Sequence, residues 1–525
     1  MLEGINSWTI LLSFAFASAF WKVLQVSSRR RKLPLPPSPP SYPIIGNIFD
    51  VPTNDMHVAK RDMNTKYGDI VYLNVCGQPM IVLGTHEAAT DLLEKRSANY
   101  SGRLFSVMSI LSGWEWLFSV TDYGTQWRKT RRLLHEYMHP NAVKQYRPIQ
   151  EREVTKYLLR LLEHPEDFLH HGRHLFGAIT IRAGYGIDVD TDKEIDYLEI
   201  AERAMAAFAV TFLPGKYLVE LVPILRYLPS CIPGGHFKRE AAEWSPIVRK
   251  MREVPWNAAM TALREGRGLP SMASGLLERT SGLDPEAAAE QVEFSKDAVA
   301  AAYTGGADTT LSTLQNIYVA MASFPEVQKR AQAELDAVVG PHRLPTFSDK
   351  EDLPYVTALI KESLRWRPVS PLALIHVSME EDEYKGFCIP KRSAMVFNIW
   401  AYTQDPRLYP DPQAFKPERY LRDGKIDPDV QDPAGIAFGY GRRICPGRHF
   451  AEASLFAVVS KLLHTMSIEP PRDESGQPID LAKTVKMTHG IISYPEPFEC
   501  IIKPRSPEAE TLIRNACSEV EAASA

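Results

Sequence analysis

The residue types best suited to chemistry lie in the stretch 438–447, which reads Phe-Gly-Tyr-Gly-Arg-Arg-Ile-Cys-Pro-Gly. It places Cys445 between glycines and arginines, with no second cysteine close enough to complete a two-cysteine metal site. Such a lone thiol could be a buried core residue, a reactive nucleophile or a metal ligand. The neighbouring Arg442 and Arg443 would stabilise a thiolate and could pair with acidic groups of a cofactor, so the stretch favours a metal ligand.

Two local elements must position this thiol. Apolar residues from Ala451 to Leu463 recur at helical spacing and predict a helix over 449–464. Cys445 would then lie just ahead of a helix N-terminus, where backbone N–H groups favour negative charge. Gly441 permits a tight turn, and Gly447 permits close approach by a flat ligand.

A second chemical motif, Gly-Gly-Ala-Asp-Thr-Thr at 305–310, lies in the middle of a long helix predicted over 294–324 and ended by Pro325. Two glycines inside a helix cost about 2 kcal/mol relative to two alanines. This indicates either a local distortion or close contact with a flat ligand. Asp308 and Thr309 supply a carboxylate and a hydroxyl there, and a widened turn could admit water and relay protons. A kinked core helix without chemistry is the alternative.

A third candidate pair is Trp127 and Arg131, which are four residues apart and therefore share one face of a helix. An indole N–H and a guanidinium directed at one place suit an anionic group such as a carboxylate. A solvated basic helix face is the alternative. His376 lies among apolar residues and is either a satisfied core histidine or a ligand-contacting side chain.

Together these motifs resemble those of the cytochromes P450, the haem-thiolate monooxygenases, in whose haem-binding loop Phe, Gly, Arg, Cys and Gly recur at the positions of 438–447. The resemblance implies that Cys445 is the axial ligand of the iron of haem b. It assigns further cofactor contacts within this loop to Phe438, Arg443 and Gly447, and propionate contacts to Trp127, Arg131 and His376.

The resemblance also implies two supporting sets of residues. Thr309 and its acidic neighbour Asp308 would deliver protons for splitting of the O–O bond. Glu362 and Arg365 are three apart on a predicted helix, and the stretch 415–420 resembles the family's second arginine motif. These two residues and Arg419 would form a structural network behind the haem.

Composition sets broad limits on the chain. Of its 525 residues, 45% are hydrophobic, which is enough for a large core, and the formal net charge of -4 gives no reason to expect a nucleic-acid partner. Six scattered cysteines fit a reducing compartment better than a disulfide framework. Length alone suggests two or more domains, but the ordered motifs predict a single catalytic domain over 44–505. We expect it to be mainly α with small β-sheets, and to be followed by a polar tail over 506–525.

The N-terminus predicts a membrane anchor. Residues 5–26 carry no charge apart from Lys22 and are rich in large apolar residues, and a helix of about 20 residues can cross a bilayer core of roughly 30 Å. A basic cluster follows at 29–32, which places the next domain in the cytosol by the positive-inside rule. A cleaved signal peptide is the alternative, although such peptides carry positive charge before the apolar run. Residues 27–43 would form a basic and proline-rich hinge, like that of microsomal P450 enzymes at the endoplasmic reticulum membrane.

The rest of the chain predicts the elements around these motifs. Residues 69–83 predict a β-hairpin, 87–95 a short helix, and 326–339 and 353–365 two further helices. Residues 369–376 and 394–399 predict short strands. The stretch 103–118 is rich in large apolar residues without a clean period, so it is either core or, by the resemblance, a lining of the substrate pocket.

The resemblance implies a single-pass membrane monooxygenase that inserts one oxygen atom from O2 into a C–H bond. Its electrons would come from NADPH–P450 reductase, with cytochrome b5 as a further candidate partner. The segments 100–103, 184–188 and 213–216 resemble basidiomycete enzymes of secondary metabolism. Glu115 is the only carboxylate in the expected pocket segments, which favours a neutral hydrophobic substrate such as a terpenoid over an indole-ethylamine.

Two functions of other classes stay open at this point. One is an O2-independent haem-thiolate isomerase or dehydratase, against which Asp308 and Thr309 argue because such an enzyme needs no proton relay for O–O cleavage. The other is a non-catalytic haem-binding or membrane-tethered interaction protein. That function would not explain why the long helix contains glycines and threonines that lower its stability.

Overall fold

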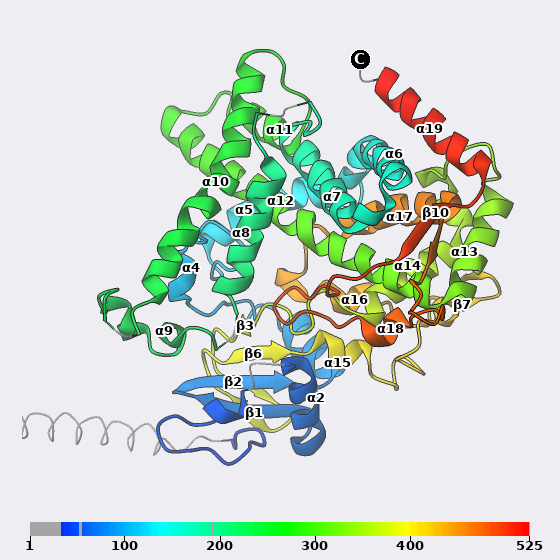
Figure 1. Ribbon diagram of the computed structural model, residues 1–525. Helices are drawn as coiled ribbons and strands as arrows, with labels where there is room; N and C mark the ends of the chain where they lie inside the picture. The colour runs from blue at the N-terminus through cyan, green and yellow to red at the C-terminus, as the bar shows by residue number, and fades with distance from the viewer. Residues whose placement is uncertain (1–32, 52–54, 192–193, 214, 233, 524–525) are drawn as a thin grey trace, which may run out of the picture.

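The computed structural model describes residues 33–51, 55–191, 194–213, 215–232 and 234–523 (Figure 1). Helices make up most of it, and a small sheet with the short helix α2 (Met56–Tyr67) forms one end of the molecule (Figure 1). The expectation of a mainly α chain with small sheets is confirmed. No helix in the described part of the chain has the length and apolar character needed to cross a bilayer. The anchor predicted over 5–26 lies outside the described residues.

The helix α12 (Pro285–Ser323) runs through the centre of the fold. Pro285 occupies its first turn, and the Asp284 side chain accepts hydrogen bonds from the backbone N–H groups of Glu286 and Ala287. The prediction of one long helix is confirmed, and this cap explains why the helix begins nine residues earlier than its apolar pattern does. It ends at Ser323, just before Phe324 and Pro325, as predicted.

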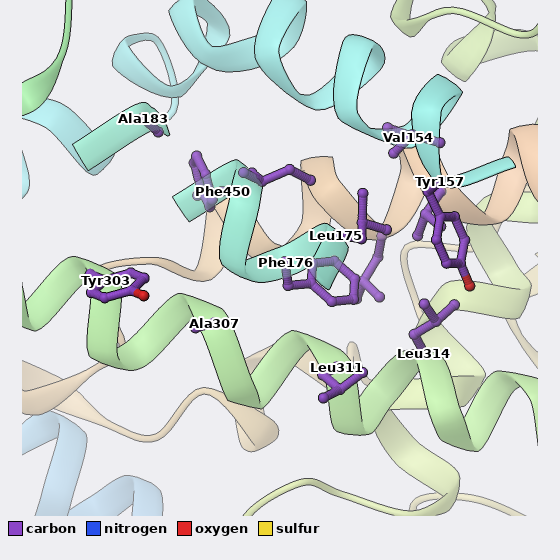
Figure 2. Packing of buried hydrophobic residues seen from close by; sticks show 14 of the residues in the cluster. Val154, Tyr157, Leu175, Phe176, Ala183, Tyr303, Ala307, Leu311, Leu314 and Phe450 are labelled. Carbon is purple, nitrogen blue, oxygen red and sulfur yellow. The ribbon is translucent and has the colours of Figure 1, made fainter. Parts of the chain in front are cut away.

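The main hydrophobic core lies where α12 meets α7 (Phe168–Tyr185) and α6 (Arg147–Glu163). Figure 2 shows Leu311 and Leu314 of α12 facing Leu175 and Phe176 of α7. A Cβ added at Gly306 would lie 2.5 Å from Cγ2 of Thr180 on α7. Gly306 therefore allows α12 to pack closely against α7. The expected contact with a flat ligand is wrong for this glycine.

The largest sheet has the strand order β1-β2-β6-β3. The hairpin predicted over 69–83 is confirmed as β1 (Ile70–Val75) and β2 (Gln78–Leu83), with Ile70 opposite Leu83. β6 (Ala394–Phe397) pairs parallel to β2 and antiparallel to β3 (His376–Val377). The strand predicted over 369–376 is wrong except at His376, because Pro371 and the positive φ of Ala373 prevent an extended ladder before it.

Further elements surround this frame. The remaining strands form three two-stranded sheets: β4 (Asp382–Tyr384) with β5 (Phe387–Ile389), β7 (Leu421–Arg422) with β8 (Lys425–Ile426), and β9 (Met466–Glu469) with β10 (Ile501–Pro504). The other helices are α3 (His86–Ala89), α4 (Val107–Leu111), α5 (Thr125–Met138), α8 (Tyr197–Thr211), α9 (Leu218–Leu221), α10 (Phe237–Arg264), α11 (Met272–Glu278), α13 (Pro325–Val338), α14 (Pro354–Trp366), α15 (Ile399–Thr403), α16 (Ala434–Ala437), α17 (Arg448–Thr465), α18 (Leu481–Thr484) and α19 (Pro507–Ala522). A π-helix, η2 (Thr90–Lys95), continues α3.

The two ends of the described chain are attached to the domain. The carbonyl of Pro37 accepts a hydrogen bond of 2.9 Å from the backbone N–H of Tyr72, and that of Pro34 accepts one of 2.8 Å from Cys388. The proline part of the predicted hinge is therefore held against the sheet. Within the polar tail predicted over 506–525, residues 507–522 form the helix α19. Its Ile513 and Cys517 are buried, four residues apart on the face that packs against α6.

Candidate active site

The Cys445 loop connects α16 to α17. The backbone N–H of Cys445 donates a hydrogen bond of 2.9 Å to the carbonyl of Phe438, which closes the loop. Gly441 has a φ of 58°, and a Cβ there would overlap the carbonyl oxygen of Leu93 in η2, so glycine is required both for the turn and for the close approach. A Cβ at Gly447 would instead meet open space.

The N-terminus of α17 holds the thiol, as the sequence predicts. α17 begins at Arg448, and the backbone N–H groups of Gly447 and Arg448 are hydrogen-bonded to the side chain of Cys445. Burial raises the pKa of the Cys445 thiol, while these N–H groups and the charge of Arg131 act in the opposite direction. The sulfur thus lies close to backbone donors and to the positive charges of Arg131 and Arg448, a setting suited to a thiolate that binds a metal.

Trp127 and Arg131 lie on α5, one helical turn apart. Trp127 is buried, and neither its Nε1 nor the buried Nη1 of Arg131 has a hydrogen-bond partner among the described residues. Burial lowers the pKa of Arg131, and the charge of Cys445 raises it. Buried donors in native proteins are nearly always paired, so these two call for an acceptor from outside the chain. The alternative of a solvated basic face is wrong for this pair.

Arg443 joins three segments of the site. Its guanidinium donates to the carbonyls of Ser101 at 2.9 Å, Phe118 at 3.2 Å and Thr121 at 2.9 Å. Its Cζ also lies 4.7 Å from the ring centroid of Trp127, and burial lowers its pKa to about 10. Arg443 therefore fastens the 101–121 segment to the Cys445 loop and fixes the orientation of Trp127.

His376 is buried at the start of β3, where its Nδ1 lies 2.8 Å from the carbonyl oxygen of Tyr100. Burial lowers the pKa of His376 well below its usual value, as do the charges of Arg103 and Arg443. The imidazole is therefore neutral, with Nδ1–H donating to the carbonyl and Nε2 left as an acceptor. Sequence reasoning left its role open, and the carbonyl partner decides the tautomer.

Arg103 is a site residue that the sequence reasoning missed. It is buried, and it donates to the carbonyls of Ser119, Leu374 and Ile375 at 2.7, 3.1 and 2.7 Å. It thereby ties the segment over the site to the strand that carries His376. The only available signal was an arginine at the edge of the apolar stretch 103–118.

Asp308 and Thr309 are adjacent on α12 but make different contacts. Thr309 Oγ1 donates a hydrogen bond of 2.6 Å to the carbonyl of Gly305, where an added Cβ would meet open space. Asp308 is buried, accepts a hydrogen bond from Tyr494 and lies 3.4 Å from Nη1 of Arg173. Burial raises the pKa of Asp308. α12 is assigned as helix without a break from Pro285 to Ser323, including Gly305.

Glu362, Arg365 and Arg419 form a compact buried network. Arg365 donates to both carboxylate oxygens of Glu362 at 2.8 Å, and Arg419 Nε lies 3.2 and 3.1 Å from the same oxygens. The remaining donors of Arg365 bind the carbonyls of Thr403, Pro412 and Ala414. Both members of the Glu362–Arg365 pair are fully buried. The network fixes the segment between α15 and η7 (Pro417–Tyr420) against α14.

Comparison with known proteins identifies the family of this chain. The family model for cytochrome P450 matches residues 36–498. This chain belongs to the cytochrome P450 family. It is 42% identical over 498 residues to cytochrome P450 monooxygenase COX2 of Coprinopsis cinerea, an alignment that covers 95% of this chain and 94% of the relative. It is also 38% identical over 511 residues to tryptamine 4-monooxygenase of Psilocybe cyanescens, an alignment that covers 95% of this chain and 98% of that relative.

The predicted family and its cofactor are thereby confirmed. A cytochrome P450 is an oxidoreductase that uses haem with a cysteine thiolate ligand, and the described residues fit that group. Cys445 would supply the thiolate, and the unpaired donors of Trp127 and Arg131 would suit acidic propionates. The positions above Gly305 and Gly447 leave room for a flat ring. Among the described residues no group of three or more histidines, cysteines or carboxylates could hold a metal ion.

Proposed function

We propose that this P450 monooxygenase inserts one oxygen atom from O2 into a C–H bond of a small, neutral, hydrophobic secondary metabolite, with a terpenoid as the favoured class. The observation that carries the proposal is the pair of unpaired buried donors on Trp127 and Arg131 beside a thiol held by backbone N–H groups. Haem bound at Cys445 supplies the activation of dioxygen and the splitting of its O–O bond.

The protein's own residues hold the cofactor and move protons. Trp127 and Arg131 would bind propionate oxygens, and Arg443 keeps the Trp127 ring in place. The neutral His376 would approach the same groups, with its position set by Tyr100. Phe438 and Gly447 shape the loop around the thiolate. Glu362, Arg365 and Arg419 brace the fold behind this loop without entering the reaction.

Proton delivery is assigned to Asp308 and Thr309. The raised pKa of Asp308 brings its proton exchange closer to neutral pH, where a general acid works best. Arg173, whose side chain is 34% exposed, connects Asp308 to solvent. Thr309 Oγ1 lies one helical turn from the open position at Gly305, and it could hold a water there by rotating away from the Gly305 carbonyl.

Charge distribution favours a neutral substrate. Glu115, the carboxylate expected in the pocket segments, is exposed to solvent. Two other carboxylates close to this region are occupied, since Glu220 accepts hydrogen bonds from Ser106 and Met108, and Asp308 is bound to Arg173. A cationic amine would have to displace one of these partners to find a counter-charge. A second candidate, hydroxylation of an indole-ethylamine, rests on the similarity to tryptamine 4-monooxygenase.

The redox partner and location follow the family type. We assign electron supply to NADPH–P450 reductase and name cytochrome b5 as a further candidate, with the chain anchored in the endoplasmic reticulum membrane and its catalytic domain in the cytosol. Arg128, Arg132 and Arg442 are exposed around α5 and the Cys445 loop, and could dock an acidic partner.

The test is expression of the full chain in microsomes with reductase, followed by a screen of terpenoids and indole-amines for oxidised products. NADPH consumption coupled to product is the expected result. Product formation without NADPH or O2 would instead indicate the haem-thiolate isomerase or dehydratase alternative, and product from indole-amines alone would favour the second candidate.

A further inference from the structure

A carboxylate from a distant helix closes the turn that leads to Cys445. The 3-10 turn η8 (Gly441–Arg443) begins at Gly441, and the side chain of the preceding Tyr440 does not cap it. The backbone N–H of Gly441 instead donates a hydrogen bond to Oε2 of Glu94, which lies 347 residues earlier in the chain. The first N–H groups of a helical turn have no partner within it, and a negative charge beside them is stabilising. Glu94 therefore caps this turn from another segment of the chain.

The helix that carries Glu94 fits closely against the turn. Glu94 belongs to the π-helix η2, and π-helices are rare and occur frequently at functional sites. The neighbouring Leu92 and Leu93 are buried in the hydrophobic cluster that also contains Tyr440. A Cβ added at Gly441 would overlap the carbonyl oxygen of Leu93. The backbone of η2 is thus fixed against the turn, and the exposed side chain of Glu94 adds a hydrogen bond to that contact.

A second hydrogen bond ties the residue before the turn to the same segment. The hydroxyl of the buried Tyr440 lies 2.9 Å from Nδ1 of His86, where α3 begins, and η2 continues α3. Burial raises the pKa of Tyr440 well above its usual value, as does the charge of Glu94, so the phenol stays protonated. The segment 86–94 therefore holds two successive residues of the loop, Tyr440 and Gly441.

The position of the turn affects the site because the turn carries Arg443 and leads directly to the thiol. Arg443 binds three carbonyls of the segment 101–121. The backbone N–H of Ile444 donates a hydrogen bond of 3.2 Å to the carbonyl of Gly441, and Cys445 follows Ile444. A displacement of Gly441 would therefore move both the Arg443 anchor and the sulfur of Cys445.

From these contacts we infer that Glu94 is a positioning residue for the haem-binding loop. Its carboxylate holds the N–H of Gly441 and thereby keeps Cys445 in the orientation that binds iron. The inference rests on the proposed role of Cys445 as the ligand. Because the Glu94 side chain is exposed, its effect comes through the hydrogen bond and not through packing in the core. Glutamine can replace it as an acceptor, whereas alanine cannot.

The test compares variants of the full-length, haem-loaded enzyme without turnover. Haem release is followed by transfer to excess apomyoglobin, and the absorption of the reduced carbon monoxide complex reports on the bond between Cys445 and iron. Glu94→Ala should release haem about threefold to tenfold faster and lose part of the red-shifted absorption, while Glu94→Gln should stay within about twofold of the parent. Glu87→Ala is the matched control and should match the parent, because Glu87 is an exposed carboxylate of α3 that pairs with Lys385.

Three results would overturn the inference. Haem release and absorption like those of the parent in Glu94→Ala would show that the bond positions nothing. Equal losses in Glu94→Ala and Glu94→Gln would assign the effect to charge, and an equal loss in Glu87→Ala would assign it to the surface of the segment. Failure of the proposed function is distinguishable, because the parent enzyme itself would then lack the red-shifted absorption.

Discussion

Replacing Glu362 by glutamine tests the buried network most directly. Glu362→Gln keeps the shape of the side chain but removes the one negative charge shared by Arg365 and Arg419. The Arg365 pair is fully buried and the Arg419 side chain is 6% exposed, so both cations would stay out of water without a counter-charge. Breaking a buried pair in this way typically costs about 3–5 kcal/mol, and we expect the free energy of unfolding to fall by that amount.

A surface pair supplies the matched control. Glu326 and Lys329 are three residues apart on α13 with side chains 79% and 69% exposed, so Glu326→Gln should change the free energy of unfolding by less than about 1 kcal/mol. Both variants and the parent would be compared by urea titration followed by tryptophan fluorescence, with haem content recorded in parallel. A loss below about 1 kcal/mol for Glu362→Gln would refute the claim that this carboxylate holds the two arginines in place.

Three further predictions concern the site and its helix. Gly306→Ala should lower the free energy of unfolding by about 1–3 kcal/mol, because the new Cβ would crowd Thr180. Gly305→Ala should be tolerated, because its Cβ would meet open space. Thermal melts of both variants would show this difference, and equal stabilities would count against the packing argument. Cys445→Ala should abolish the red-shifted absorption of the reduced carbon monoxide complex together with monooxygenase activity, and full turnover would exclude it as the ligand. Thr309→Ala should keep haem bound but divert electrons from NADPH into peroxide; an unchanged ratio of product to NADPH would remove Thr309 from proton delivery.

The glycines of α12 show where sequence reasoning was limited. Two adjacent glycines lower the stability of a helix, and the sequence alone suggests the same explanation for both of them. The structure separates the two, since Gly306 meets Thr180 of α7 and Gly305 faces open space. No local pattern could reveal this difference, because the partner at Thr180 is more than a hundred residues away in the chain.

Long-range contacts also decided the roles of the arginines. The sequence places Arg443 beside Cys445, but its three carbonyl partners lie in the segment 101–121. Arg103 was missed for the same reason, since its acceptors come partly from residues 374–375. A guanidinium in an apolar stretch has no predictable partner until folding brings carbonyls to it.

By itself, the sequence determined the local elements and the chemistry of the motifs: the helix that starts after Cys445, the long helix carrying Asp308 and Thr309, and the hairpin over 69–83. Each depends on residues close together in the chain, whose spacing and capping act over a few turns. Tertiary structure alone decided which donors remain unpaired, which carboxylates are occupied, and that the C-terminal residues pack as α19. Those properties depend on burial and on partners from distant segments, and water is excluded from them only when the whole core has assembled.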